Sequence, residues 1–386
     1  MLPPRHPPVK KPGNANSARV SLVQTVMRTL CLLLLASFSV ADDAFDFELF
    51  SRLAAREGNV VCSPLSVRVA LAMAHGGARG TTAAEMASVL RLDGDGLAKL
   101  ARAYDGKDGR PALADAAWVQ EGATLLPAYE EFLARQYGAP PVAVDFGAAD
   151  AAARRINAWV SERTGDRIRG IVSPDMFNAN TTLVLANALH FKAAWEEPFK
   201  ARTREAPFAL ASGERIEVPM MVQTEHFGYA EKDGAQAVEL PYERGRYSMV
   251  VVLPREGVPA AVPEGLLGSL KDTHVTVHLP RFRVETAFRL EETLALMGMP
   301  SAFGPDAEFS GMNGKKDLFV STVAHKAFIA VDEEGTEAAA ATAVMAEVKG
   351  DVSKPVAFRA DRPFLFLIRD REAGSVLFLG RVSDPR

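Results

Sequence analysis

The sequence has little cysteine, little aromatic material and little net charge. Two cysteines among 386 residues exclude a disulfide-stapled scaffold, because such chains are dense in cysteine. A formal charge of −4, from 44 basic and 48 acidic residues, argues against nucleic acid as a partner, because phosphate binding requires a basic surface. The chain is 48% hydrophobic, which is enough for a large core and excludes a disordered protein.

Catalytic motifs are absent as well. The sequence contains no G-x-S-x-G turn, no H-E-x-x-H helix, no P-loop and no cysteine and histidine cluster at metal-ligand spacing. We therefore expect no enzymatic activity, no catalytic residue, no cofactor and no metal.

The one strongly apolar run near the N-terminus is short. Leu30 to Ala36 follows the basic residue Arg28 and is too short for a helix to span about 30 Å of hydrocarbon. Ser39 and Ala41 are small residues of the kind that a signal peptidase requires. We predict that residues 1–41 are an N-terminal extension and secretory signal peptide, cleaved after Ala41, and that Met27 is the true start.

Cleavage after Ala41 changes the charge and the cysteine content of the chain. The removed segment carries five basic residues and no acidic one, which takes the formal charge from −4 to −9. Cys62 then has no cysteine partner, so we expect no internal disulfide. The product would be extracellular, or periplasmic in a Gram-negative host. A cytosolic chain with an unusual apolar start and an uncleaved anchor are the alternatives.

Helical patterns dominate the first half of residues 42–386 and strand patterns the second. Helices are predicted at Phe45–Ala55, Pro64–Met73 with Ser63 as N-cap, Thr82–Leu92 capped at Thr81 or Thr82, Leu97–Tyr104, Tyr129–Tyr137, Ala149–Arg163, and Phe288–Met297 with Gly298 as C-cap. Strands are predicted at Asp115–Glu121, Thr181–Phe191, Ala237–Leu240, Tyr247–Leu253, Val275–Leu279, Phe319–Val331, Phe364–Arg369 and Val376–Val382. Because no repeat or clean linker interrupts these patterns, we predict a single α+β domain.

Residues 333–357 do not fit either pattern. A structureless loop of this length inside a compact fold is uncommon and is usually functional. Alternate residues from Thr336 to Val348 are uncharged and mostly small, whereas the intervening residues from Glu337 to Lys349 carry every charge. Because successive side chains of a strand point to opposite faces, this composition suits a strand with one buried face. An alanine-rich helix is the alternative, and the pattern does not decide between them.

These residues carry a family resemblance. The stretch HKAFIAVDEEGTEAAAAT, from His325 to Thr342, resembles the hinge of inhibitory serpins almost residue for residue. Similar matches are NVVCSPLSVRVALAM and GARGTTAAEM within 59–86, ANALHFKAAWEEPF at 186–199, LPRFRVE at 279–285, GMPSAFGPDAEFSGM at 298–312 and PFLFLIRDREAGSVLFLGRVSDP at 363–385. Gly76 and His190 depart from the family pattern, which has a larger apolar residue and an aromatic there.

The resemblance implies a fold and an activity. The fold is that of the serpins, with helices packed around a large central mixed β-sheet, two smaller sheets and an exposed reactive-centre loop at about 333–357. The activity is suicide inhibition: a serine protease cuts the loop, stays bound as an acyl-enzyme, and is trapped when the loop inserts into the central sheet. The resemblance assigns the hinge to Glu333, Gly335, Thr336, Glu337, Ala338, Ala339, Ala340, Ala341 and Thr342.

The hinge composition favours an inhibitory member. Gly335 gives the backbone freedom to turn, and the inward-facing positions from Thr336 to Thr342 contain no charge and no proline. A charge there would be costly to bury, and a proline could not donate to the sheet. A non-inhibitory carrier, chaperone or storage serpin is the alternative, as is a member that is cut without trapping.

Counting locates the reactive bond. Glu333 through Lys349 spans 17 residues, the usual spacing in inhibitory serpins, which places the cut at Lys349–Gly350. A lysine there suits a trypsin-like protease with a carboxylate in its specificity pocket. Alternatives are Lys354, which precedes a proline, and Val348 or Met345 for elastase-like or chymotrypsin-like enzymes.

The resemblance also implies supporting residues. It places Ser63, Ser66, Asn187 and His325 in a shutter beneath the sheet, and Trp195 and Arg281 at the breach where the loop enters, with Arg281 paired to Glu333. A buried polar cluster without a switching role and a plain core tryptophan are the alternatives. The expected partner is a serine protease in covalent complex. We expect a monomer, with no nucleic-acid or membrane binding, and no strong heparin binding because residues 93–110 are mixed in charge.

Overall fold

The computed structural model describes residues 43–92, 94–107, 110–178, 180–199, 203–256, 261–337 and 354–386. All of them belong to the compact unit Ala41–Arg386. The predicted cleavage after Ala41, the hinge residues Ala338–Thr342 and the predicted reactive bond Lys349–Gly350 lie outside the described residues. Within the described residues, no helix has the length and apolar character needed to cross a membrane.

Helices and strands interleave as predicted, and the α+β class is confirmed. The described α-helices are α2 (Asp43–Leu53), α3 (Pro64–His75), α4 (Gly80–Leu90), α5 (Gly96–Ala103), α6 (Pro127–Tyr137), α7 (Ala149–Arg163), α8 (Glu291–Leu296) and α9 (Ser310–Asn313). The described strands are β1 (Val60–Cys62), β2 (Ala112–Gln120), β3 (Val142–Val144), β4 (Leu183–His190), β5 (Ala193–Ala194), β6 (Arg204–Ala209), β7 (Arg215–Lys232), β8 (Ala235–Pro241), β9 (Tyr247–Pro254), β10 (Lys271–Pro280), β11 (Phe282–Arg289), β12 (Val320–Val331), β13 (Gly335–Thr336), β14 (Val356–Arg359), β15 (Phe364–Asp370) and β16 (Ser375–Val382).

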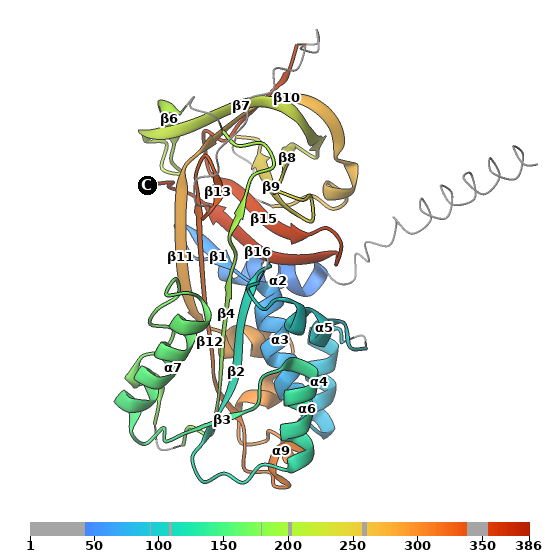
Figure 1. Cartoon of the computed structure of the whole chain (residues 1–386), viewed down its shortest axis with the longest axis vertical. Helices are drawn as coiled ribbons and strands as arrows, with labels where there is room; N and C mark the ends of the chain where they lie inside the picture. Colours follow the sequence, from blue (N-terminus) through green and yellow to red (C-terminus); the bar gives the residue numbers. More distant parts are fainter. Residues whose placement is uncertain are drawn as a thin grey trace, which may run out of the picture. The chain divides into compact units, whose positions relative to one another are not determined.

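These strands form two hydrogen-bonded sheets in the described part of the chain. A seven-stranded mixed sheet has the order β3-β2-β4-β12-β13-β5, with β11 on the other side of β12 (Figure 1). A nine-stranded sheet runs β1-β16-β15-β9-β8-β7-β10-β14, with β6 on β7. Strand β7 is 18 residues long and pairs with β6 at its start, with β10 along its middle and with β8 at its end, so it joins the two expected smaller sheets into one.

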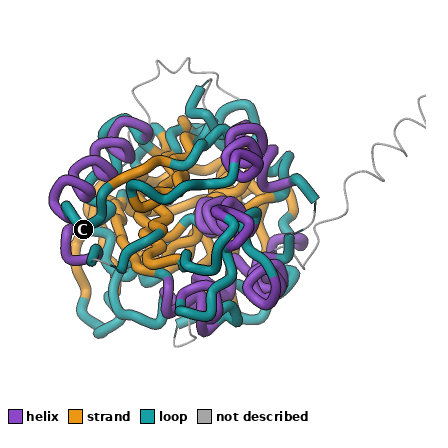
Figure 2. The backbone as a smooth tube through the Cα atoms, turned by 90° about the horizontal axis from the view of Figure 1, so that it is seen from below, coloured by secondary structure: helices purple, strands orange, loops and turns teal. Residues whose placement is uncertain are grey.

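The centre of the seven-stranded sheet, at β2 and β4, is buried on both faces. Helix α3 packs against β2 and β4 on one face, and α7 packs against the same strands on the other (Figure 1). Seen from below, strands fill the interior of the unit and helices and loops surround them (Figure 2). On β4, Leu185 and Leu189 join the large core on the α3 side, whereas Ala186 and Ala188 join the smaller core beneath α7. The polar residues in the middle of these strands, Asp115 and Asn187, are therefore buried.

Two predicted helix boundaries are wrong. Phe288 belongs to β11, which pairs with β12 along its whole length, and α8 begins only at Glu291 and ends at a C-cap on Met297. Helix α4 begins at Gly80 with Arg79 as N-cap. Thr82 caps no helix, because its Oγ1 accepts the backbone N–H of Glu308 instead. In both cases a tertiary contact overrides the local pattern.

Ser63 and Gly76, at the two ends of α3, are explained by their contacts. The Ser63 side chain accepts the backbone N–H of Ser66, so Ser63 is the N-cap as predicted. A Cβ atom at Gly76 would lie 2.1 Å from the Phe132 ring. The departure from the family pattern at Gly76 therefore makes room for an aromatic side chain from α6.

Candidate functional site

Three polar side chains form a row across the middle of the seven-stranded sheet. Asp115 of β2 lies opposite Asn187 of β4, and Asn187 lies opposite His325 of β12. All three point to the α3 face, because they share the strand parity of the apolar residues that contact α3. Asn187 and His325 are fully buried, and Asp115 is 7% exposed.

The first turn of α3 completes this row with two serines. The Ser63 backbone N–H donates to His325 Nε2 at 3.0 Å, and Ser66 Oγ lies 3.2 Å from both Asp115 Oδ1 and Asn187 Oδ1. We call these five residues the polar cluster. The polar cluster contains all four residues predicted for the shutter, Ser63, Ser66, Asn187 and His325. Each of them has a hydrogen bond to another of the four.

The hydrogen bonds fix the tautomer of His325. Because Nε2 accepts from Ser63, the proton resides on Nδ1, which donates to Asn187 Oδ1 at 2.6 Å. The Asn187 Nδ2 group donates to the carbonyl of Ala324 at 3.2 Å. Burial lowers the pKa of His325 to about 4, so the ring is neutral near pH 7.

Asp115 was not among the residues predicted from the sequence. Burial raises the pKa of its carboxyl well above the usual range of an aspartate, which the hydrogen bond to Ser66 only partly opposes. The sequence did hold a signal: a single acid in the otherwise small and apolar run ALADAAWVQ, at the parity of the buried residues Ala117 and Val119.

The hinge begins as a short strand at one end of the same sheet. Gly335 and Thr336 form β13, where Thr336 pairs with Val331 of β12 and the two residues pair with β5. Only glycine fits at position 335, because φ is +153° and a Cβ atom would lie 2.2 Å from the carbonyl oxygen of Ala193. Thr336 is fully buried, with Oγ1 2.6 Å from the hydroxyl of Tyr242.

Trp195 covers this strand. Its ring stacks on Tyr242 with centroids 4.5 Å apart, and its Nε1–H donates to the carbonyl of Asp332 at 3.0 Å. Its backbone N–H donates to the carbonyl of Glu334 at 2.9 Å. The structure therefore places Trp195 where the chain leaves β12 and turns back.

A bidentate ion pair lies beside the same turn. Arg281 Nε is 2.8 Å from Glu333 Oε2, and Arg281 Nη2 is 2.6 Å from Glu333 Oε1. Thr203 Oγ1 also donates to Glu333. Burial opposes ionisation of Glu333, but its hydrogen bonds to Arg281 and Thr203 lower its pKa overall. The side chain of Arg281 is 52% exposed, so solvent screens this pair.

Glu337 departs from the expected strand parity. Its φ of +49° is left-handed, so the strand stops at Thr336 and the Glu337 side chain turns inward. There it is only 4% exposed, with one oxygen 2.9 Å from His190 Nε2 and 3.2 Å from Arg167 Nε. In the described structure Glu337 therefore does not follow the alternation of a strand, and His190, the second departure from the family pattern, is its partner.

Comparisons with known proteins agree with this fold and site. The family model described as serpin (serine protease inhibitor) matches residues 40–385. The leukocyte elastase inhibitor of Bos taurus is 39% identical over 375 residues, which cover 90% of this chain and 99% of the relative. The chain belongs to the serpin family, so the resemblance in the sequence is confirmed.

Solved structures give the same result. Serpin48 of the insect Tenebrio molitor, described as a highly specific serpin, matches with a TM-score of 0.80 and 32% identity over 90% of this chain and 98% of that one. Human thyroxine-binding globulin matches with a TM-score of 0.82 and 27% identity over the same shares. The family description thus places the chain with inhibitors of serine proteases rather than with enzymes, and serine proteases are the partners of that class.

Proposed function

We propose that this protein is a secreted suicide inhibitor of trypsin-like serine proteases, cut at Lys349–Gly350. The serine hydroxyl of the protease attacks the carbonyl carbon of Lys349, and Gly350 leaves as a free amine that takes the proton. An ester then joins the two proteins. Insertion of the loop as a strand between β4 and β12 distorts the protease before water hydrolyses this ester.

The observation that carries the proposal is the position of β13. Its two residues already form the first rungs of a strand that runs antiparallel to β12, against β5 on the other side. Beyond that point β4 and β12 are paired directly, from Leu183 with Val320 to Leu189 with Ala327. Continuation of β13 therefore requires these two strands to separate, and each added residue gains the hydrogen bonds of a central strand.

The energy available from insertion is large. A net gain of roughly 0.5–1.5 kcal/mol per hydrogen bond gives on the order of 10 kcal/mol for a strand of about a dozen residues. The inward-facing positions of the hinge are small and uncharged in the sequence, so their burial between β4 and β12 carries little desolvation cost.

The test is a reaction of residues 42–386 with trypsin, followed by a denaturing gel and mass spectrometry of the released C-terminal peptide. A covalent complex together with a peptide that begins at Gly350 is the expected result. Lys349→Ala should abolish the complex with trypsin, whereas Lys354→Ala should leave it intact. Cleavage after Lys349 without a complex would refute inhibition and favour a substrate-like or carrier role.

Secretion is tested separately. We expect expression of the full chain in its own host, or in a bacterial host with an export pathway, to give an exported product that begins at Asp42. An intracellular product that retains Met27 would contradict the signal peptide without affecting the inhibitory mechanism.

A further inference from the structure

The hydroxyl of Ser66 is shared between two acceptors. It has one hydrogen, yet its Oγ lies 3.2 Å from Asp115 Oδ1 and 3.2 Å from Asn187 Oδ1. If Asp115 is ionised, its carboxylate can only accept. The single hydroxyl hydrogen of Ser66 then reaches either Asp115 Oδ1 or Asn187 Oδ1, and the other of these oxygens faces a lone pair of Ser66 Oγ. If Oδ1 of Asp115 carries a proton, it donates to Ser66 Oγ and Ser66 donates to Asn187.

Only the protonated form fills every contact of the polar cluster. Asp115 then donates to Ser66, Ser66 and the His325 Nδ1–H both donate to Asn187 Oδ1, and the Ser63 N–H donates to His325 Nε2. The second oxygen of Asp115 is buried without a hydrogen-bond partner. A neutral carbonyl oxygen tolerates that position far better than a charged one does.

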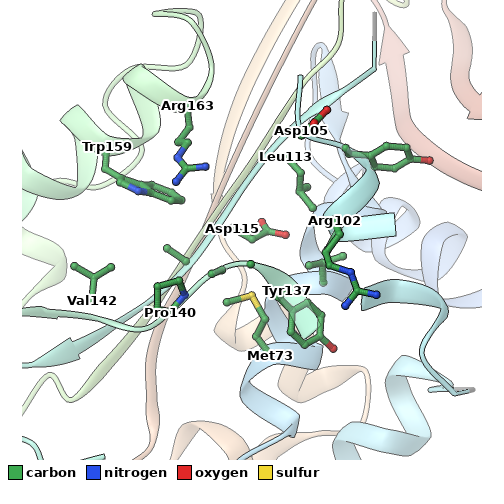
Figure 3. A pocket seen from close by; sticks show the side chains of 16 residues that line it. Met73, Arg102, Asp105, Leu113, Asp115, Tyr137, Pro140, Val142, Trp159 and Arg163 are labelled. Carbon is green, nitrogen blue, oxygen red and sulfur yellow. The ribbon is translucent and has the colours of Figure 1, made fainter. Parts of the chain in front are cut away.

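Among the residues that the structure describes, none supplies a balancing cation to Asp115. A cavity of about 450 Å³ borders it, and Arg102, Asp105 and Arg163 also line this cavity (Figure 3). Each is engaged elsewhere: Arg102 donates to the carbonyls of residues 135 and 136, Asp105 pairs with the Arg110 guanidinium, and Arg163 lies over the Trp159 ring. The polar cluster and the cavity wall add three further titratable groups, His325, Tyr104 and Tyr137. Burial lowers the pKa of His325 and raises the pKa of both tyrosines, so all three are neutral near pH 7.

We propose that Asp115 is a protonated member of the polar cluster, and that loss of its proton loosens the hold of the cluster on β4 and so eases the separation of β4 from β12. The link to sheet opening rests on the proposed function. It follows from position: a strand inserted between β4 and β12 would move them from about 4.8 Å to about 9.6 Å apart and break the bond between Asn187 and His325. Whatever weakens the anchoring of Asn187 to Ser66 therefore favours opening.

The direction of the pH effect follows from the two protonation states. Above the ordinary pKa of an aspartate, about 3.9, the unfolded chain has released this proton while the folded chain still holds it. The folded state then loses stability as the pH rises, and the loss stops once the pH passes the raised pKa of Asp115. Asp115→Asn removes this dependence and keeps the donor, because its amide N–H replaces the carboxyl O–H toward Ser66.

The first experiment compares urea unfolding of the uncut wild type and D115N between pH 4 and pH 9. Near pH 4 the two should be equally stable. With rising pH the ratio of their unfolding equilibrium constants should grow up to tenfold per pH unit in favour of D115N, and then level off. Asp306→Asn, the same change at an exposed position, should follow the wild type at every pH. Parallel profiles of wild type and D115N would overturn the proposal.

A second readout does not depend on the stability of a variant. The infrared spectrum of the uncut wild type at pH 7 should contain the carbonyl band of one protonated carboxylic acid, which D115N lacks and Asp306→Asn retains. Absence of that band in the wild type would overturn the proposal even if D115N failed to fold.

The effect on loop insertion is measured last. With rising pH, the rate of loop insertion after cleavage should increase at least tenfold more in the wild type than in D115N. In proteins that also carry Ser66→Ala, Asp and Asn at position 115 should give the same rate. A protein that shows the stability and infrared results but forms no protease complex would contradict only the proposed function. Equal insertion rates in the wild type and D115N across the pH range would overturn the link to sheet opening.

Discussion

Two points along the proposed insertion path are held closed in different ways. The polar cluster beneath the middle of the sheet is buried and, in the state that fills its hydrogen bonds, neutral. At the breach, the Arg281–Glu333 pair lies nearer to solvent, with the arginine side chain 52% exposed, whereas Glu337 is buried against His190 and Arg167. Buried hydrogen bonds are costly to leave unmade, whereas an exposed ion pair contributes about 0–1 kcal/mol. We therefore expect the Arg281–Glu333 pair to offer little resistance to insertion and the polar cluster to offer more.

The largest expected effect comes from blocking the path at its first buried position. Thr336→Arg would place a charge where the native side chain is fully buried against Tyr242. An unpaired buried charge costs several kcal/mol, so the rate of covalent complex formation with trypsin should fall at least 100-fold, with cleavage retained. Ala339→Arg, at the opposite strand parity in the sequence, is the matched control and should retain trapping. Equal rates for the wild type and Thr336→Arg would contradict insertion through β13.

Removal of the centre of the polar cluster should have the next largest effect. Asn187→Ala leaves the His325 Nδ1–H, the Ser66 hydroxyl and the Ala324 carbonyl without their partner. At about 1–3 kcal/mol per unsatisfied buried group, we expect a loss of about 4 kcal/mol in the free energy of unfolding, measured in urea. Asn180→Ala, at an exposed position, should change it by less than about 0.5 kcal/mol. A similar loss in both variants would contradict the account of the cluster.

Acid should weaken the cluster through His325. Its pKa is about 4 in the folded protein, below the ordinary value of about 6.5, so between these values the unfolded chain binds a proton that the folded chain does not. The folded state should therefore lose on the order of 3 kcal/mol as the pH falls from 6.5 to 4. This loss of stability is best measured in D115N, because in the wild type protonation of Asp115 stabilises the folded state as the pH falls and so opposes the effect of His325. Titration of the His325 ring near pH 6.5, followed by NMR, would contradict this prediction.

The smallest effect is expected at the breach. Arg281→Ala removes a bidentate pair whose arginine is half exposed, so the free energy of unfolding should fall by about 0.5 kcal/mol, and less in 1 M salt. The same substitution at Arg283, whose contact to Glu285 is long, serves as the control. A loss above 2 kcal/mol for Arg281→Ala would show that the breach, and not the polar cluster, dominates.

Periodic segments of the sequence predicted the fold well. The apolar pattern of 64–73 and the Ser63-Pro64 cap placed α3 correctly, and the runs that became β9 and β15 were found with small errors at their ends. Strand β11 was not predicted. Phe282 and Val284 follow the alternation of a strand, but the end of the segment, from Phe288, also suits a helix. In such segments, contacts with residues that are far away in the sequence determine the secondary structure.

The site was predictable only in part. Four members of the polar cluster came from family resemblance, whereas Asp115 required knowledge of which strands pair in register. The buried position of Glu337 could not be predicted from alternation, because one left-handed residue reverses the direction of its side chain. A strand pattern describes the inserted loop, and the described structure holds the hinge before insertion.

The central claim is that the pairing of β4 with β12 is a resting state that accepts the loop. The direct measurement is thermal unfolding of the intact chain and of a chain cut within residues 338–353 by a zinc metalloprotease, which forms no acyl-enzyme. The account predicts that the cut chain unfolds about 20 °C higher, because on the order of 10 kcal/mol is released on insertion. An unchanged unfolding temperature, with the cut confirmed by mass spectrometry, would contradict it.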